Sequence, residues 1–262
     1  MIHQSATVSP LASVARDAHI GPGAIIHPFV TILPGVLIEE ACQIFPGAVL
    51  GRPPVATAAI ARRPDPVGGL RLATGIVVGA GAVIYAGVEI DAESLVGDHA
   101  VIRERVDIGA RCIVGQGVTV GYEVEIADEV RIMDNAHITG RSRIGRGTFI
   151  AQHVTTANDS ALAQRLAADA YEFRSDEVRG VDIGAAVFIG AGACILPGIR
   201  IGDRAIIGAQ ALVTHDVEDG VTVMGIPARP PGAVALDPAS ADGIRAQLAP
   251  GERTPARKPR AA

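Results

Sequence analysis

The stretch IMDNAHITGRSRIGRGTFIAQHV, residues 132–154, decides the fold because its aliphatic residues recur at every sixth position. The period is set by Ile132, Ile138, Ile144 and Ile150, and it fits neither an α-helix nor an ordinary alternating strand. A smaller residue stands two positions before each of them, as Ala136 does before Ile138. Positions two apart share one face of a strand, so both residues of such a pair point inward and the rest of the hexad turns.

The same register extends over most of the chain in both directions. It runs from Ile2 to Leu50, restarts at Leu72 and runs to Thr156, and restarts again from Ile183 to Val213. Three short strands for each 18 residues close a triangular prism whose coils stack. The sequence therefore predicts an all-β chain with one parallel β-helix of about ten coils over residues 1–230.

Three segments fall outside this register. Two interruptions, at about 51–74 and about 157–180, predict loops that leave the prism, and loops of this kind often form a binding face. The C-terminal segment 231–262 ends in a basic, proline-rich run, which predicts a tail that is partly helical or disordered.

Composition excludes several classes of protein. The 262 residues are 48% hydrophobic but only 3% aromatic, and the net charge is −5, so nothing favours a nucleic-acid partner. There is no uninterrupted apolar run of about 18 residues and no signal-peptide pattern at the N-terminus, so neither a membrane span nor export is expected. Three irregularly spaced cysteines predict neither disulfides nor a zinc site, which favours a cytoplasmic protein.

Stacking of coils turns residues that are 18 apart into columns. One predicted corner column holds His99, Gly117, Asn135 and His153, and His137 lies on the next outward face. Since the second loop leaves beside this face, these polar residues are candidates for a cleft site, although solvated outward residues would give the same pattern. The remaining residues of these types are expected to be structural: the four histidines His3, His19, His27 and His215, the inward Cys42 and Cys112, and the isolated outward Cys194.

The C-terminal coils VFIGAGACILPGIRIGDRAIIGAQALVTHDVEDGVTVMGIPARPPG, residues 187–232, resemble the last coils of the hexapeptide-repeat acyltransferase family. The resemblance implies a left-handed β-helix and a homotrimer that binds acetyl-CoA, or another acyl-CoA, between adjacent subunits. It places five residues along the cofactor: Gly190, Ala191, Gly208, Ala209 and Arg229.

The middle coils are similar to those of the nucleotide-sugar N-acetyltransferases. The shared pattern is Asp134–Asn135, then Thr156-Ala157-Asn158-Asp159, a loop, and Arg179. The segments MDNAHITG (133–140) and FPGAVLGRPP (45–54) also resemble the UDP-N-acetylglucosamine acyltransferase group. These resemblances imply transfer of an acyl group to an amine of a sugar or nucleotide-sugar, without a metal. The catalytic candidates are His153, His137 and Asn135, and the substrate-binding candidates are Asn158, Asp159, Arg179 and His99.

Departures from these families leave alternatives open. The UDP-N-acetylglucosamine acyltransferases have their catalytic base where this chain has Gly140, and the histidine motifs of other O-acetyltransferases are also absent. A free amine attacks a thioester without prior removal of a proton, so the missing bases favour N-acylation over O-acylation. An O-acyltransferase or an enzyme that uses an acyl carrier protein remains an alternative, as does a catalytically silent trimeric scaffold. A γ-carbonic-anhydrase-like metalloprotein would need an H-x4-H pair, which the sequence lacks.

Overall fold

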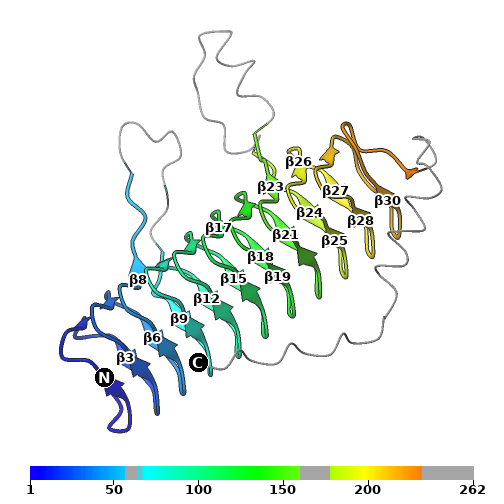
Figure 1. The fold of residues 1–262 in the computed structure, drawn as a ribbon. Coiled ribbons are helices and arrows are strands. Elements are labelled where there is room, and N and C mark those ends of the chain that lie inside the picture. Colours follow the sequence, from blue (N-terminus) through cyan, green and yellow to red (C-terminus); the bar gives the residue numbers. More distant parts are fainter. Residues whose placement is uncertain (57–63, 65–66, 160–177, 232–262) are drawn as a thin grey trace, which may run out of the picture.

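The computed structural model describes residues 1–56, 64, 67–159 and 178–231. In these ranges the chain winds as a solenoid of short parallel strands, with about eleven turns where the hexads predict about ten (Figure 1). The all-β parallel β-helix is thereby confirmed, while the predicted tail lies outside the described residues except for its first position. The left-handed sense stays a prediction.

Every third strand belongs to the same sheet, so the solenoid has three flat faces. We name each sheet after its outward side chains: the apolar sheet, the histidine sheet, which carries His137, and the charged sheet. The apolar sheet contains β1 (Thr7–Val8), β4 (Ile25–Ile26), β7 (Gln43–Ile44), β10 (Val77–Val78), β13 (Leu95–Val96), β16 (Ile113–Val114), β19 (Arg131–Ile132), β22 (Phe149–Ile150), β25 (Phe188–Ile189), β28 (Ile206–Ile207) and β30 (Thr222–Val223).

Along the chain, a strand of the histidine sheet and then a strand of the charged sheet follow each of the first nine strands of the apolar sheet. The histidine sheet contains β2 (Ser13–Val14), β5 (Thr31–Ile32), β8 (Val49–Arg52), β11 (Val83–Tyr85), β14 (Val101–Ile102), β17 (Thr119–Val120), β20 (His137–Ile138), β23 (Thr155–Thr156), β26 (Cys194–Ile195) and β29 (Leu212–Val213). The charged sheet contains β3 (His19–Ile20), β6 (Leu37–Ile38), β9 (Arg71–Leu72), β12 (Glu89–Ile90), β15 (Asp107–Ile108), β18 (Glu125–Ile126), β21 (Arg143–Ile144), β24 (Asp182–Ile183) and β27 (Arg200–Ile201).

The core is the stack of inward residues that the hexads predict. Ile138 is 0% exposed and Ala136, two positions earlier, is 1% exposed, and the other coils repeat this pair. Burying an isoleucine contributes about 1.5–3 kcal/mol, so a ladder of such residues stabilises a prism that contains almost no aromatic filler. Cys42 and Cys112 occupy inward positions as predicted, and each thiol lies within hydrogen-bond distance of a backbone carbonyl oxygen in the next coil.

Most corners from Gly23 onward turn through a residue with positive φ. At the corner between the apolar and histidine sheets this residue is glycine in some coils, such as Gly117, and a polar side chain in others, such as Asn135 and His153, both at 58°. Such a backbone costs a non-glycine residue about 1 kcal/mol or more, so the surrounding coils must hold it in place. A carboxylate helps: Asp134 Oδ1 accepts the N–H of Gln116 from the coil before it, at 3.0 Å.

Both predicted loops leave the prism at the same corner, between the histidine and charged sheets. The first connects β8 to β9 and the second connects β23 to β24. The register continues across both loops, because Gln43 pairs with Val77 and Phe149 with Phe188. The described ends of both loops leave the solenoid on the same side, so the part of the histidine sheet from β8 to β23 lies between the two points of departure (Figure 1).

The charged sheet gives a first testable prediction. Asp107 lies in register between Glu89 and Glu125, and its pKa is raised by burial and then by the charges of Glu89, Glu125 and Asp91. The raised pKa means that the contribution of Asp107 to stability is lost as the pH rises through that pKa. We expect Asp107→Asn to raise the free energy of unfolding at neutral pH by about 0.5 kcal/mol or less, because water and salt screen an exposed charge.

Asp182→Asn is the matched control for this prediction. Asp182 lies in register between two arginines, Arg143 and Arg200, so losing its charge should lower the free energy of unfolding. Urea unfolding of both variants at low and high salt measures the two effects. Equal signs for the two substitutions would contradict an electrostatic origin.

Candidate functional site

The predicted corner column exists. The N–H of Asn135 donates to the carbonyl oxygen of Gln116, and the N–H of His153 donates to that of Asp134, so His153 stands one coil above Asn135. His99 and Gly117 continue the column in the opposite direction, and all four residues have φ between 56° and 64°. We call this edge, where the apolar and histidine sheets meet, the histidine corner.

The side chains of the histidine corner lean over the preceding coil. A Cβ added to Gly117 would lie 2.5 Å from Oδ1 of Asn135, and one added to Gly81 would lie 2.5 Å from Nδ1 of His99. Glycine below each of these side chains therefore leaves room for it. The residue below His153 is Asn135 and not a glycine, so two candidate side chains lie next to each other on this edge, and both are exposed.

His137 stands on the flat face beside this corner. It is the outward residue of β20 and lies in register between Thr119 of β17 and Thr155 of β23. Burial lowers the pKa of His137 from its ordinary 6.5, because the charged imidazolium is less well solvated there than in water. At neutral pH the ring is therefore uncharged and able to accept a proton.

Thr156 is the last residue of β23, where the chain leaves the histidine sheet for the second loop. It takes an inward position that is aliphatic in the neighbouring coils, and its Oγ1 accepts the N–H of Thr139 at 2.8 Å. The corresponding N–H in the preceding coil, that of Gly121, bonds instead to a backbone carbonyl oxygen, that of Ile138. The hydroxyl thus satisfies a buried donor that the departing strand would leave unpaired.

The loop root itself holds Asn158, Asp159 and Arg179 at the next corner, which we call the loop corner. The N–H of Arg179 donates to the carbonyl oxygen of Asn158 at 3.1 Å, which closes the loop, and Asn158 Nδ2 donates to the carbonyl oxygen of Gly140 at 3.3 Å. Arg179 lines a cavity of about 600 Å³ with Glu123, Arg141 and residues of the charged sheet. The side chain of Asn158 is therefore hydrogen-bonded to the chain just after β20. Arg179 lies on the side of the corner that faces the charged sheet.

A side chain at Gly140, where the UDP-N-acetylglucosamine acyltransferases have their base, would meet the ring of Tyr122, which would have to move. An added Cβ would lie 2.8 Å from Cε1 of Tyr122, so the tyrosine ring of the preceding coil covers this position. The next column, outside β17 and β20, holds only Gly121 and the small Thr139. Only small residues therefore stand on the surface beside His137, and the ring of Tyr122 borders this surface.

The predicted cofactor residues continue the histidine corner beyond His153. The N–H of Gly192 donates to the carbonyl oxygen of Gln152, so the turn at Ala191 stacks on the His153 coil. The N–H of Gln210 donates to the carbonyl oxygen of Ala191, so the turn at Ala209 stacks on the next coil. Glycine at 190 and 208 is required by stacking alone, because an added Cβ would lie within 2.5 Å and 2.7 Å of the next coil. Stacking does not account for the alanines at positions 191 and 209, which remain candidates for contact with the predicted cofactor.

Arg229 lies at the end of the solenoid. Its backbone pairs with Met224, and the N–H of the adjacent Ala228 donates to the carbonyl oxygen of Leu212 in the last strand of the histidine sheet. Arg229 lines a cavity of about 460 Å³ there together with Thr214 and His215. The predicted catalytic residues and four of the predicted cofactor residues thus follow the histidine corner and the histidine sheet, whereas Arg229 lies at the end of the solenoid.

A group of residues on the histidine sheet could not be found from the spacing of the sequence alone. The outward side chains of Arg52, Tyr85 and Arg103 stack in successive coils, and the buried carboxylate of Glu104 lies beneath Arg103. The 18-residue spacing links Tyr85 with Arg103, but the first loop separates Arg52 from both in sequence. Only the pairing of β8 with β11 reveals that contact.

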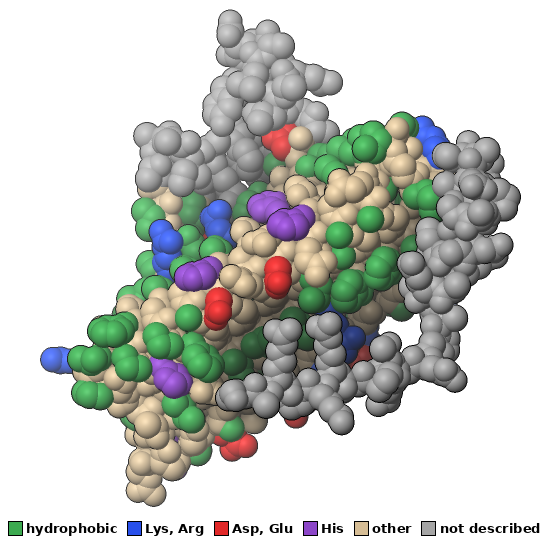
Figure 2. All heavy atoms as spheres, in the orientation of Figure 1, with side chains coloured by type: hydrophobic (Ala, Val, Ile, Leu, Met, Phe, Trp, Pro, Cys, Tyr) green, Lys and Arg blue, Asp and Glu red, His purple; other side chains and the backbone are tan. Residues whose placement is uncertain are grey.

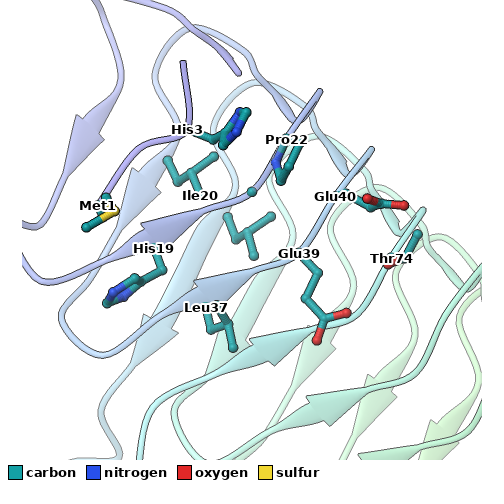
Figure 3. Close-up of a pocket in the computed structure, with 11 residues that line it drawn as sticks. Met1, His3, His19, Ile20, Pro22, Leu37, Glu39, Glu40 and Thr74 are labelled. Carbon is teal, nitrogen blue, oxygen red and sulfur yellow. The ribbon is translucent and has the colours of Figure 1, made fainter. Parts of the chain in front are cut away.

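Several histidine side chains lie along the visible face of the solenoid (Figure 2). A separate cavity of about 380 Å³ lies among the first coils, against the charged sheet, where His3, His19 and Glu39 line it (Figure 3). It contains none of the predicted site residues. No group of three or more metal-ligating side chains occurs within the described ranges, and no helix in those ranges is long and apolar enough to cross a membrane.

Residues 180–215 match the family model described as "Bacterial transferase hexapeptide (six repeats)", which confirms the predicted hexapeptide repeat in these coils. The chain is 51% identical over 41 residues to the galactoside O-acetyltransferase of Lactococcus lactis, an alignment that covers 16% of this chain and 20% of the relative. It is 54% identical over 43 residues to the 2,3,4,5-tetrahydropyridine-2,6-dicarboxylate N-acetyltransferase of Staphylococcus aureus, covering 16% and 18% of the two chains.

A similar solved structure is the UDP-N-acetylglucosamine O-acyltransferase of Moraxella catarrhalis. It is 16% identical, with a TM-score of 0.44, over 94% of this chain and 77% of that one. The chain spans only about a fifth of the length of the two curated relatives above, which have an oxygen acceptor in one case and a nitrogen acceptor in the other.

Proposed function

We propose that this hexapeptide-repeat chain is an acyltransferase that moves an acetyl or other acyl group from acyl-CoA to an amine of a sugar or nucleotide-sugar. One observation carries the proposal: the Asn135–His153 pair and the turns at Ala191 and Ala209 occupy consecutive coils of the histidine corner. These turns belong to the segment that matches the transferase repeat. An acyl donor along the turns would bring its thioester to the coils that carry the polar side chains.

Each candidate residue has a separate role in the proposed reaction. The amine nitrogen attacks the thioester carbonyl carbon, and the tetrahedral intermediate expels the CoA thiolate. The proton that the amine loses passes to the neutral ring of His137, which burial keeps uncharged at neutral pH, and then to the thiolate. Asn135 and His153 orient the acceptor and the acyl carbonyl group, and backbone N–H groups of the glycine-rich turns stabilise the oxyanion. Asn158, Asp159, Arg179 and His99 contact the acceptor.

A homotrimer with sites between its subunits completes the proposal. The apolar sheet exposes large side chains in several coils: Ile25 at 39%, Leu95 at 40%, Phe188 at 46% and Ile206 at 44%. Phe149 and Phe188 stack with their ring centroids 5.5 Å apart. A row of exposed apolar residues on a flat sheet favours a protein interface, and copies of the same chain can bury it symmetrically. This sheet ends at the histidine corner, so a neighbouring subunit would form the second wall of the site.

O-acylation is the second candidate. The lowered pKa of His137 supports it, because a neutral imidazole could also remove the proton of a hydroxyl group. An acyl carrier protein as donor fits the same geometry. The silent scaffold and the metalloprotein have no supporting observation of their own.

Thiol release from acetyl-CoA and longer acyl-CoA esters, measured across a panel of amino sugars, nucleotide-linked amino sugars and their hydroxyl analogues, tests the proposal. We expect turnover with an amine acceptor and none with its N-acetylated form. Release only with hydroxyl acceptors would replace N-acylation with O-acylation. If neither CoA esters nor acyl carriers are bound or turned over, the acyltransferase assignment is wrong.

A further inference from the structure

One arginine stands in the outward row of the apolar sheet. In the described strands of this sheet, the first residue of each strand points outward, and Arg131 of β19 is the only charged one. It is exposed, and Ile113 of β16 and Phe149 of β22 flank it in register. A positive charge therefore lies in the middle of the surface that a neighbouring subunit would cover in the proposed trimer.

Arg131 makes no ion pair with an acidic side chain of the described ranges. Two arginines near it differ in this respect, because Arg111 and Arg146 both pair with Glu129. An unpaired charge is strongly unfavourable once a neighbouring subunit shields it from water. In the assembly, the guanidinium of Arg131 must therefore meet an anion.

Arg131 belongs to the coil of the candidate site. β19 is followed directly by the histidine corner at Asn135 and then by His137 of β20. Within one chain Arg131 and His137 point away from each other, because their strands belong to different faces of the prism. A three-fold rotation about an axis parallel to the solenoid keeps every coil at its height. Arg131 of one subunit is then level with His137 of the next.

The histidine sheet is the face that suits the apolar sheet of a neighbouring subunit. A cyclic trimer joins two different surfaces of the chain. The outward row of the charged sheet contains Glu89, Asp107 and Glu125, whose burial would be unfavourable. The first residues of the described histidine-sheet strands include no carboxylate, lysine or arginine. With these two sheets face to face, Arg131 lies opposite a row that offers no acidic partner, so its anion must come from the reaction.

We propose that Arg131 of the neighbouring subunit completes each candidate site and stabilises the oxyanion of the tetrahedral intermediate. The inference rests on the acyltransferase function and the trimer proposed above. When the amine attacks, the thioester carbonyl oxygen gains a negative charge, and it becomes a carbonyl oxygen again when the CoA thiolate leaves. The guanidinium adds a charged donor to the backbone N–H groups of the turns, in apolar surroundings that strengthen the attraction.

Kinetics of Arg131→Gln test the role in the reaction. We expect kcat of acyl transfer to fall about 10²-fold with little change in KM, because the contact forms only in the transition state. Light scattering should still show a trimer. Arg143→Gln, on the charged sheet of the same coil, should keep the kcat of the unaltered chain. A near-normal kcat in Arg131→Gln would overturn the proposal, and so would dissociation, which would make Arg131 an interface residue only.

Mixed trimers test whether the contribution crosses between subunits. Arg131→Gln chains are co-expressed with His137→Ala chains in equal amounts. If Arg131 acts on the next subunit, about one quarter of the sites keep both residues, and activity should recover to about that fraction. If both residues act within one chain, every site lacks one of them. Absence of recovery would therefore contradict a shared site.

Cross-linking gives a readout that does not depend on activity. Cys194, which is half-buried, is first replaced by serine. A bismaleimide with a reach of about 10 Å, the usual distance between packed sheets, should join Arg131→Cys to His137→Cys of the next subunit and give covalent multimers. The pair of Arg131→Cys and Arg143→Cys should stay monomeric on a denaturing gel.

The cross-linking outcomes separate this inference from the function on which it rests. Multimers from the Arg143→Cys pair alone, or from neither pair, would overturn the placement of Arg131. If the His137→Cys pair links but no acyl-CoA is turned over by the unaltered chain, the placement stands. The acyltransferase proposal then fails, and the catalytic role of Arg131 fails with it.

Discussion

Replacing His137 with alanine is expected to lower kcat of acyl transfer by about 10²-fold or more, with a much smaller change in KM for the acyl donor. His137 is the outward residue of β20, and the small residues Gly121 and Thr139 stand beside it. Burial lowers the pKa of His137. Loss of the ring removes a proton acceptor that acts in the transition state, so the effect should fall on kcat. Steady-state kinetics with the best acceptor from the panel gives the measurement.

The pH dependence adds a readout that a structural role would not change. In the free enzyme, kcat/KM should fall only at a pH below the ordinary histidine pKa of 6.5, because the pKa of His137 is lowered and its protonation removes the base. This acid limb should disappear in His137→Ala. His19→Ala, on the charged sheet, serves as the control for loss of an exposed histidine. If His153→Ala loses the larger factor while His137→Ala keeps the limb, the base is at the histidine corner. Near-normal rates from both variants would remove general-base catalysis by histidine.

Phe188→Glu is expected to separate the subunits and to abolish most of the activity. Phe188 is 46% exposed on the apolar sheet and stacks on Phe149, so a subunit interface on this sheet would enclose it. A carboxylate there would be buried in the assembly without a partner, which costs several kcal/mol at each interface. Since the histidine corner borders this sheet, a separated chain would lack one wall of its site.

Leu37→Glu provides the matched control. Leu37 is 39% exposed in β6 on the charged sheet, so the same type of substitution there should leave the assembly intact. Light scattering after size-exclusion chromatography gives the mass, and thiol release gives the activity. A Phe188→Glu chain that remains trimeric would place the interface elsewhere. A monomer with full activity would show that each site is complete within one chain.

The sequence predicts the architecture well because one physical period governs it. Ile132, Ile138 and Ile144 are inward because each hexad makes one short strand and one turn, and nothing else in the chain competes with that pattern. The corner column of Asn135 and His153 follows from the same arithmetic, since stacked coils place residues 18 apart above one another. The register also survives both loops, which the restarts at Leu72 and Ile183 had indicated.

The rest of the site depends on contacts that the period does not encode. Arg52 meets Tyr85 only because the first loop returns the chain to the neighbouring coil. Gly140 could be read as a missing base, whereas the structure shows that the ring of Tyr122 covers that position. Thr156 ends one run of the hexad register, and only the structure shows that its hydroxyl accepts the N–H of Thr139 where the strand departs. Side-chain direction at corners and loop roots decides each case, and sequence spacing does not carry that information.

Titration of the full chain with CoA tests the central claim most directly, because it requires no knowledge of the acceptor. The histidine-corner account predicts saturable binding of one CoA for each chain. It also predicts that Ala209→Trp, which fills the exposed turn two coils beyond His153 without altering the inward residues, weakens this binding strongly. Absence of CoA binding at millimolar concentration, or unchanged binding by Ala209→Trp, would contradict a donor site on this corner.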